Sequence, residues 1–185
     1  METHVCPWYI GYFLINPLRR WMQNPNKILT PLVQDGMAVL EVVPGMGFFT
    51  LPLARLVGER GRIYSVDVQE KMLQSLKRRA AKAGLTGRIE SRICSGASLQ
   101  IGDLAGKIDF ALAFAVVHEV PDQKKLFAEI RGSLKKNGRL LISEPDGRVT
   151  AEKFDETLAL AAGEGFRVVE RPSISRSYSA VLECV

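Results

Sequence analysis

From residue 37 onward, continuous apolar runs alternate with stretches in which apolar residues recur every three or four positions. A run such as Ala38–Val42 is typical of a strand that is covered on both faces of a sheet. A stretch such as Gln69–Ala83, with its apolar residues on one face, is typical of an amphipathic helix. The pattern predicts strands at residues 38–42, 62–66, 88–93, 108–114, 139–143, 166–170 and 178–184.

Helices are expected between most of these strands, and cap residues support them. Asn24-Pro25 has the form of an N-cap followed by proline at the first helical position, and Thr150 is an N-cap candidate for the last helix. The predicted helices span residues 17–23, 25–33, 49–57, 69–83, 122–134 and 152–162. Strands that alternate with helices form a mainly parallel sheet with helices on its faces.

The last two predicted strands are joined by a Pro-Ser-Ile-Ser loop, which is too short to hold a crossover helix. These two strands must therefore be antiparallel. The predicted fold class is α/β: a doubly wound, mostly parallel seven-stranded sheet with a C-terminal antiparallel hairpin. A chain of 185 residues is long enough to build one domain with a proper core.

Composition and charge narrow the classes of function only slightly. The formal net charge of +5 comes from 25 basic and 20 acidic residues, which argues for neither a nucleic acid nor an anionic lipid as partner. The densest basic run, Lys77-Arg78-Arg79 with Lys82, is interpreted as the solvated face of the helix at 69–83. With no nucleic-acid module or basic stripe, a small-molecule substrate is favoured.

Cysteine usage and the apolar N-terminus bear on the compartment. Cys6, Cys94 and Cys184 are odd in number and lack metal-type spacing, so they are interpreted as free thiols of a reducing cytoplasm, with no metal site. The apolar run at residues 5–15 is too short to span a bilayer and lacks the features of a signal peptide. We expect a cytoplasmic protein without stable membrane insertion.

The segment 1–36 is expected to form a helical and aromatic cap that belongs to the same domain as residues 37–185. It carries a cluster of bulky side chains that includes Trp8, Tyr9 and Tyr12. Two interpretations stay open. The cluster covers one end of the sheet, as most aromatic clusters do, or it forms a lid over a binding site.

Candidate chemistry gathers where the first two strands end. Glu41 lies at the end of the first strand and is followed by Gly45 and Gly47, while Asp67 ends the second strand. In an open α/β sheet, nucleotide-like ligands bind over the carboxyl ends of neighbouring strands. The glycines let the backbone approach such a ligand, and the Asp67 carboxylate can accept hydrogen bonds from ribose hydroxyls.

The glycine pattern separates two kinds of nucleotide ligand. Gly45-x-Gly47-x-x-Thr50 matches the dinucleotide fingerprint G-x-G-x-x-G incompletely. With Glu41 as the acid, the stretch resembles the first motif of class I S-adenosylmethionine-dependent methyltransferases, acid-x-Gly-x-Gly-x-Gly. Residues 109–122 resemble that family's fourth strand and its loop, and residues 134–145 resemble its turn into the fifth strand. The chain is most similar to the small-molecule branch that includes the ubiquinone/menaquinone biosynthesis methyltransferases.

The resemblance implies a Rossmann-like methyltransferase fold, with S-adenosylmethionine as methyl donor and S-adenosylhomocysteine as product. The methyl group would pass directly and in line to a small-molecule acceptor. Asp67 would hold the ribose and Val68 would pack on the adenine. The donor-binding residues implied by the resemblance are Glu41, Val43, Gly45, Gly47, Asp67, Val68, Ser95, Gly96, Ala97, Ala115 and Val116.

Two positions depart from the family pattern. Val43 stands where the motif has its first glycine, and Gly96 stands where an acid usually accepts from the adenine amino group. Adenine would then be held by backbone groups around Ser95 and Ala97. These departures keep other functions open: a donor-binding partner protein that has lost turnover, an NAD-type oxidoreductase that uses Gly45-x-Gly47 and Asp67, and an RNA methyltransferase.

His118, after the fourth predicted strand, is the candidate catalytic residue. An imidazole with an ordinary pKa near 6.5 can accept a proton from a substrate hydroxyl or thiol. Alternatively, His118 is a structural residue that hydrogen-bonds its own loop. Glu119 and Glu144 are the other titratable candidates, and each is interpreted as a loop anchor or a capping group.

Overall fold

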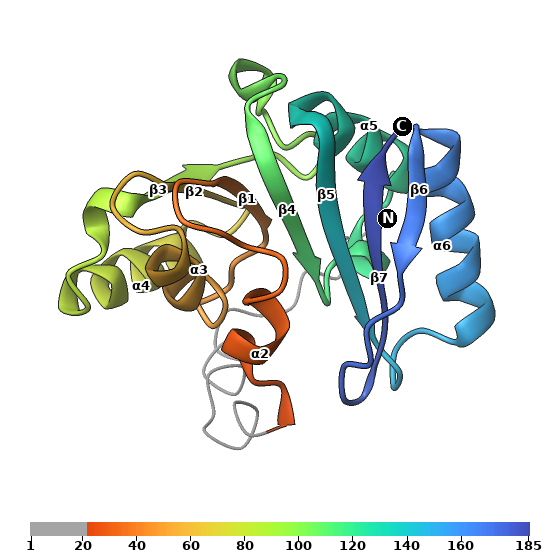
Figure 1. The fold of residues 1–185 in the computed structure, drawn as a ribbon, viewed down its shortest axis with the longest axis horizontal. Helices are drawn as coiled ribbons and strands as arrows, with labels where there is room; N and C mark the ends of the chain where they lie inside the picture. Colours follow the sequence, from red (N-terminus) through yellow and green to blue (C-terminus); the bar gives the residue numbers. More distant parts are fainter. Residues whose placement is uncertain (1–21) are drawn as a thin grey trace. The chain divides into compact units, whose positions relative to one another are not determined.

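The computed structural model describes residues 22–185, which form two compact units that meet in the sequence between Ser95 and Gly96 (Figure 1). We call residues 22–95 the N-terminal unit and residues 96–185 the C-terminal unit. The aromatic cluster near Trp8, the thiol Cys6 and most of the helix predicted at 17–23 lie outside the described residues. The cap at residues 1–36 therefore stays a prediction.

The N-terminal unit is a three-stranded parallel sheet with helices between its strands. Its strands lie in the order β3-β2-β1, and the pairs β1–β2 and β2–β3 are both parallel. The elements are α2 (Pro25–Leu29), β1 (Ala38–Val42), α3 (Thr50–Leu56), β2 (Arg62–Asp67), α4 (Glu70–Lys82) and β3 (Ile89–Ile93). Asn24 caps α2 by accepting from two backbone N–H groups, as predicted, although the helix ends at Leu29 rather than at residue 33.

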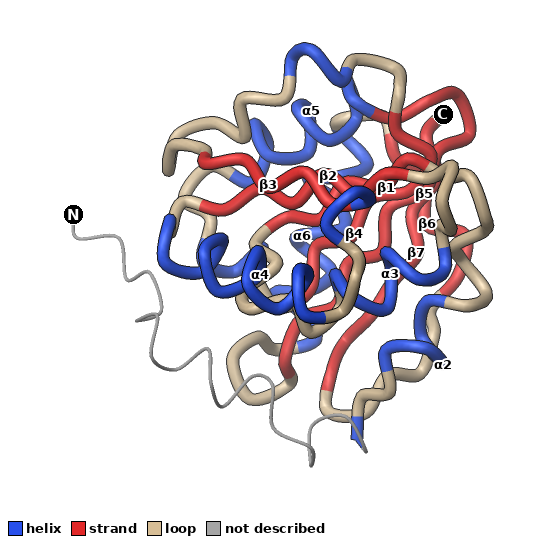
Figure 2. The backbone as a smooth tube through the Cα atoms, turned by 90° about the vertical axis from the view of Figure 1, so that its left-hand side faces the viewer, coloured by secondary structure: helices blue, strands red, loops and turns tan. Residues whose placement is uncertain are grey.

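Helices α3 and α4 cover one face of this three-stranded sheet (Figures 1 and 2). The amphipathic pattern predicted for α4 is confirmed, because Met72, Leu73, Leu76 and Ala80 are buried. The parallel pairing brings the carboxyl ends of the strands to one edge, where Val42 pairs with Val66. The loop that follows β1 therefore starts beside the end of β2.

The C-terminal unit has four strands in the order β4-β5-β7-β6. Strands β4 and β5 are parallel, and β7 runs antiparallel to both β5 and β6, which confirms the predicted hairpin. Helix α6 packs on β6 and against α5, and Thr150 caps α6 as predicted. The elements are β4 (Ile108–Phe114), α5 (Gln123–Ser133), β5 (Leu134–Pro145), α6 (Ala151–Gly163), β6 (Phe166–Glu170) and β7 (Ser177–Cys184), with a short 3₁₀ turn η4 (Val117–Glu119).

The start of β5 differs from the prediction. The strand begins at Leu134, not at residue 139, because Leu134 already pairs with Ile108 before the register shifts. Asn137 has a φ of 62°, so the chain bends between the two paired stretches. The strand also ends at Pro145, two residues after the predicted end. The other strand boundaries agree with the predictions to within a residue, and the α/β fold class with its seven strands and C-terminal hairpin is confirmed. None of the helices within residues 22–185 is long and apolar enough to cross a bilayer.

Candidate functional site

The loop after β1 has an alternating left-handed backbone. Val43, Gly45 and Gly47 have φ values of 55°, 57° and 86°. The Val43 N–H donates to the Val66 carbonyl at 2.8 Å, which extends the β1–β2 pairing by one residue. A positive φ is ordinary for glycine but strained for a β-branched side chain. Val43 therefore has the left-handed backbone conformation that favours glycine, although its side chain is β-branched.

The two glycines of this loop are required for different reasons. A Cβ on Gly45 would meet no atom within 4 Å, so Gly45 leaves open space beside the backbone. A Cβ on Gly47 would lie 2.6 Å from Leu76 Cδ1, so the loop packs directly on α4 at that point. A ligand can thus approach the backbone closely at Gly45, whereas the Leu76 side chain occupies the space beside Gly47.

Glu41 is a buried carboxyl group at the end of β1. Its Oε2 accepts from Thr50 Oγ1 at 2.6 Å and from Ser65 Oγ at 3.0 Å. Burial raises the pKa of Glu41 to about 7, against the lowering effect of these two hydrogen bonds, and the charge of Asp67 raises it further. Glu41 therefore accepts from two side-chain hydroxyls through one oxygen, and its contact with the donor stays a prediction.

Asp67 is fully buried at the end of β2. Its Oδ1 accepts from the Gln69 N–H at 2.8 Å, which fixes the chain as it enters α4. Its carbonyl accepts from the Cys94 N–H at 3.0 Å and so extends the β2–β3 pairing. Asp67 therefore anchors the turn that leads into α4.

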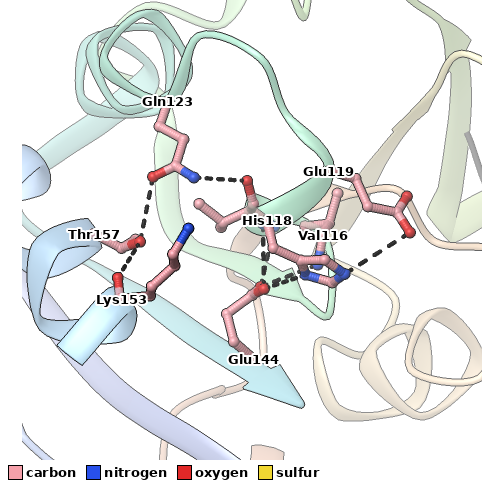
Figure 3. Close-up of polar contacts among 8 residues, drawn as sticks. Val116, His118, Glu119, Gln123, Glu144, Lys153 and Thr157 are labelled. Atoms are coloured by element: carbon pink, nitrogen blue, oxygen red, sulfur yellow. Dashed lines mark hydrogen bonds and ion pairs between the residues drawn. The ribbon is translucent and has the colours of Figure 1, made fainter. Parts of the chain in front are cut away.

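The loop after β4 is held by a single carboxylate of β5. Glu144 Oε1 accepts from the N–H groups of Val116 and Val117 at 3.1 Å and 3.0 Å. Glu144 Oε2 accepts from the His118 N–H at 3.2 Å and also contacts the ring nitrogen Nδ1 of His118 (Figure 3). The interpretation of Glu144 as a loop anchor is confirmed. Ala115, just before these residues, has a φ of 56° and donates to the Ser143 carbonyl at 2.7 Å.

The His118 ring lies between two carboxylates. Nδ1 faces Glu144, and Nε2 lies 3.9 Å from Glu119 Oε1 (Figure 3). The hydrogen bond to Glu144 raises the pKa of His118 against the opposing effect of burial, the charges of both carboxylates add to the rise, and Arg148 lowers it. A carboxylate only accepts hydrogen bonds, so Nδ1 carries a proton and Nε2 is the nitrogen that exchanges one.

Three contacts near these loops have no local signature in the sequence. Gln123, the first residue of α5, donates from Nε2 to the Val117 carbonyl at 3.2 Å, and its Oε1 accepts from Thr157 Oγ1 of α6 at 3.2 Å (Figure 3). In the N-terminal unit, Arg79 donates to the Met46 carbonyl. The prediction that Arg79 is solvated is wrong, since it is half-buried, whereas Lys77, Arg78 and Lys82 are exposed as predicted.

The remaining candidates are divided between the two units. Val68 is half-buried directly after β2. Ser95 ends one unit and Gly96 begins the other, followed by Ala97. A Cβ on Gly96 would meet no atom within 4 Å. The donor contacts assigned to these residues, and to Ala115 and Val116, stay predictions.

A family model described as a methyltransferase domain matches residues 33–170. The chain belongs to this family. Among curated proteins it is similar to the ubiquinone/menaquinone biosynthesis C-methyltransferase UbiE of Marinomonas sp., with 28% identity over 127 residues, 67% of this chain and 50% of the relative. The Klebsiella pneumoniae UbiE is 30% identical over 112 residues, 60% of this chain and 44% of the relative. The chain thus spans about half the length of these curated relatives.

Solved structures support the fold. A SAM-dependent methyltransferase from Aquifex aeolicus matches with a TM-score of 0.87 and 24% identity, covering 98% of this chain and 100% of that one. The [4+2]-cyclase SpnF matches with a TM-score of 0.69 and 21% identity, covering 82% of this chain and 59% of that one. Likeness at this level shows the fold alone. Family membership confirms the sequence-based assignment of a methyltransferase domain.

Proposed function

We propose that the protein transfers a methyl group from S-adenosylmethionine to a small-molecule acceptor. The observation that carries the proposal is the end of the β1–β2 pair, where a left-handed glycine loop lies between two buried acids, Glu41 and Asp67. Membership of the methyltransferase domain family supports it. The names of the curated relatives, which act in quinone biosynthesis, favour a small organic acceptor over a macromolecule.

The residues of the N-terminal unit fit the chemistry of the donor. Asp67 would accept from the ribose hydroxyls, and Gly45 would face the amino-acid part across open space. Gly47 shapes the loop, and Val68 would pack on the adenine. When bound, S-adenosylmethionine supplies a methyl group already activated by the positive charge on sulfur.

In the C-terminal unit, we propose His118 as the group that takes up the acceptor's proton. Nε2 would accept the proton of an acceptor hydroxyl or thiol, because Nδ1 is committed to Glu144. The negative charge of Glu144 would stabilise the imidazolium that results. The backbone around Ser95, Gly96 and Ala97, together with Ala115 and Val116, is assigned to the donor on the same proposal.

Isothermal titration with S-adenosylmethionine and S-adenosylhomocysteine tests donor binding. Both should bind the wild type, and Asp67→Asn should bind each at least about tenfold more weakly, since a carboxylate accepts from hydroxyls better than an amide does. Glu59→Gln, an acid whose side chain is 91% exposed in the same unit, is the matched control and should bind as the wild type does. If folded wild-type protein binds neither compound, the proposal is wrong.

A second candidate function rests on Val43. A strained side chain in place of the motif's first glycine favours a donor-binding partner protein without turnover. Donor binding without methylation of any compound in a panel of phenols, thiols and amines would support this candidate. Protection from thermal unfolding by NAD, without protection by S-adenosylmethionine, would instead establish the oxidoreductase alternative.

We also infer that the protein acts in the cytoplasm and does not bind nucleic acid. Cys184 is a buried free thiol, which supports a reducing compartment. Binding of a random-sequence RNA that weakens steeply with salt would contradict the second inference.

A further inference from the structure

We propose that Arg79 is a positioning residue for the donor-binding loop, residues 43–47. Helix α4 contacts this loop through Leu76 and Arg79. The inference rests on the proposed function in one respect, namely that residues 43–47 bind the donor. Nothing in the local sequence around Arg79 indicates this role, because Arg79 belongs to a basic run whose other members are exposed.

The first point of support is the contact between Leu76 and Gly47. Leu76 is fully buried, and its Cδ1 lies where a side chain on Gly47 would begin, 2.6 Å from the ideal Cβ position. Gly47 has a φ of 86°, so its backbone conformation and the contact with α4 both require glycine. The loop therefore packs directly against α4 at Gly47.

The second point of support is the hydrogen bond from the Arg79 guanidinium to the Met46 carbonyl. Residues 76 and 79 are three apart on α4, which places them on one face of the helix. They contact adjacent residues of the loop, 47 and 46. Two neighbouring contacts from one helical face restrict the position and orientation of the loop relative to α4 more than either contact alone.

The environment of Arg79 indicates more than a surface contact. Burial lowers the pKa of Arg79, and the described part of the chain gives it no ion pair. Moving a guanidinium partly out of water costs free energy unless a hydrogen bond offsets the loss of hydration. The bond to the Met46 carbonyl can do so, because a charge-assisted hydrogen bond is stronger than a neutral one. Arg78, the next residue along, is exposed and offers a matched control.

The experiment compares Arg79→Met, Arg79→Lys and Arg78→Met with the wild type. One readout is the affinity for S-adenosylhomocysteine by isothermal titration, and the other is amide hydrogen exchange of residues 43–49 without ligand. Arg79→Met keeps the apolar stem but removes the donor groups, so we expect affinity about tenfold lower and faster exchange in the loop. Arg79→Lys should lie between, and Arg78→Met should match the wild type.

The outcomes separate this inference from the proposed function. If Arg79→Met binds S-adenosylhomocysteine as tightly as the wild type, or if Arg78→Met loses as much affinity, Arg79 does not position the loop. If the wild type binds no S-adenosylhomocysteine, the proposed function is wrong, and loop exchange still decides whether Arg79 holds the loop. Equal exchange in Arg79→Met and Arg78→Met would then overturn the positioning role. Arg79→Lys covers the case in which Arg79→Met does not fold.

Discussion

Glu144 holds His118 twice, by accepting from its backbone N–H at 3.2 Å and by contacting its ring at Nδ1. The same carboxylate accepts from the N–H groups of Val116 and Val117, so one buried side chain sets both the loop and the imidazole. The orientation of the ring and the shape of the loop are therefore coupled, and a change at Glu144 should affect both.

Glu144→Gln should lower the pKa of His118, because the carboxylate that stabilises the imidazolium becomes neutral. The chain has two histidines, so the His118 ring signal can be assigned by its loss in His118→Asn and followed by NMR as a function of pH. Glu119→Gln is the control and should lower the pKa less, since Glu119 lies 3.9 Å from Nε2 and is partly exposed. An unchanged His118 pKa in Glu144→Gln would contradict the pairing.

Glu41 should make stability depend on pH. Its pKa is about 7 in the folded protein against an ordinary value of 4.5, so the folded state binds more protons than the unfolded state between these pH values. Its contribution is fully present below pH 4.5 and is lost as pH rises through about 7. Glu41→Gln removes this pH-dependent contribution to stability. We expect the free energy of unfolding of the variant, relative to the wild type, to rise by about 3 kcal/mol from pH 4 to pH 8.

Denaturant unfolding at several pH values measures this difference. Asp35→Asn, which removes an exposed carboxylate paired with Arg60, is the control for the loss of an acid. A relative stability of Glu41→Gln that stays constant across the range would contradict the raised pKa of Glu41, because the folded and unfolded states would then bind equal numbers of protons there.

Local pattern was sufficient to predict most of the fold. Strands 38–42 and 166–170 have the predicted bounds, and Thr150 caps α6 as its residue type suggests. The early start of β5 was missed because it depends on pairing between Leu134 and Ile108, far apart in the sequence. Periodicity along one segment contains no information about such a partner.

The candidate site likewise has residues that local sequence predicts and partners that only the folded chain reveals. The acids and glycines after β1 and β2 could be predicted because a strand end, a turn and a carboxylate follow one another within a few residues. The partners that hold them could not. Arg79 meets Met46 across 33 residues, and Thr157 meets Gln123 across 34, so only the folded chain brings them together. The assignment of donor contacts to individual residues stays a prediction.

Val43 should tolerate glycine better than its neighbour Val42 does. Val43→Gly relieves a left-handed conformation that costs a β-branched residue about 1–2 kcal/mol, which offsets the entropy that glycine adds to the unfolded chain. Its free energy of unfolding should change by less than about 1 kcal/mol. Val42→Gly, at a strand position 2% exposed, should lose about 3 kcal/mol. Equal losses in denaturant unfolding would show that Val43 is not strained.

The two loop glycines should respond differently to alanine. Both have positive φ, so each substitution costs about 1 kcal/mol of backbone strain. Gly47→Ala also drives a methyl group into Leu76, 2.6 Å from its Cβ position, and should lose at least about 1 kcal/mol more than Gly45→Ala. Thermal and denaturant unfolding of the two variants measure the gap. Adding Leu76→Ala to Gly47→Ala should cost less than Leu76→Ala costs in the wild type, because removing the Leu76 side chain relieves its overlap with the new methyl group. Additive losses would show that α4 does not support the loop through Leu76.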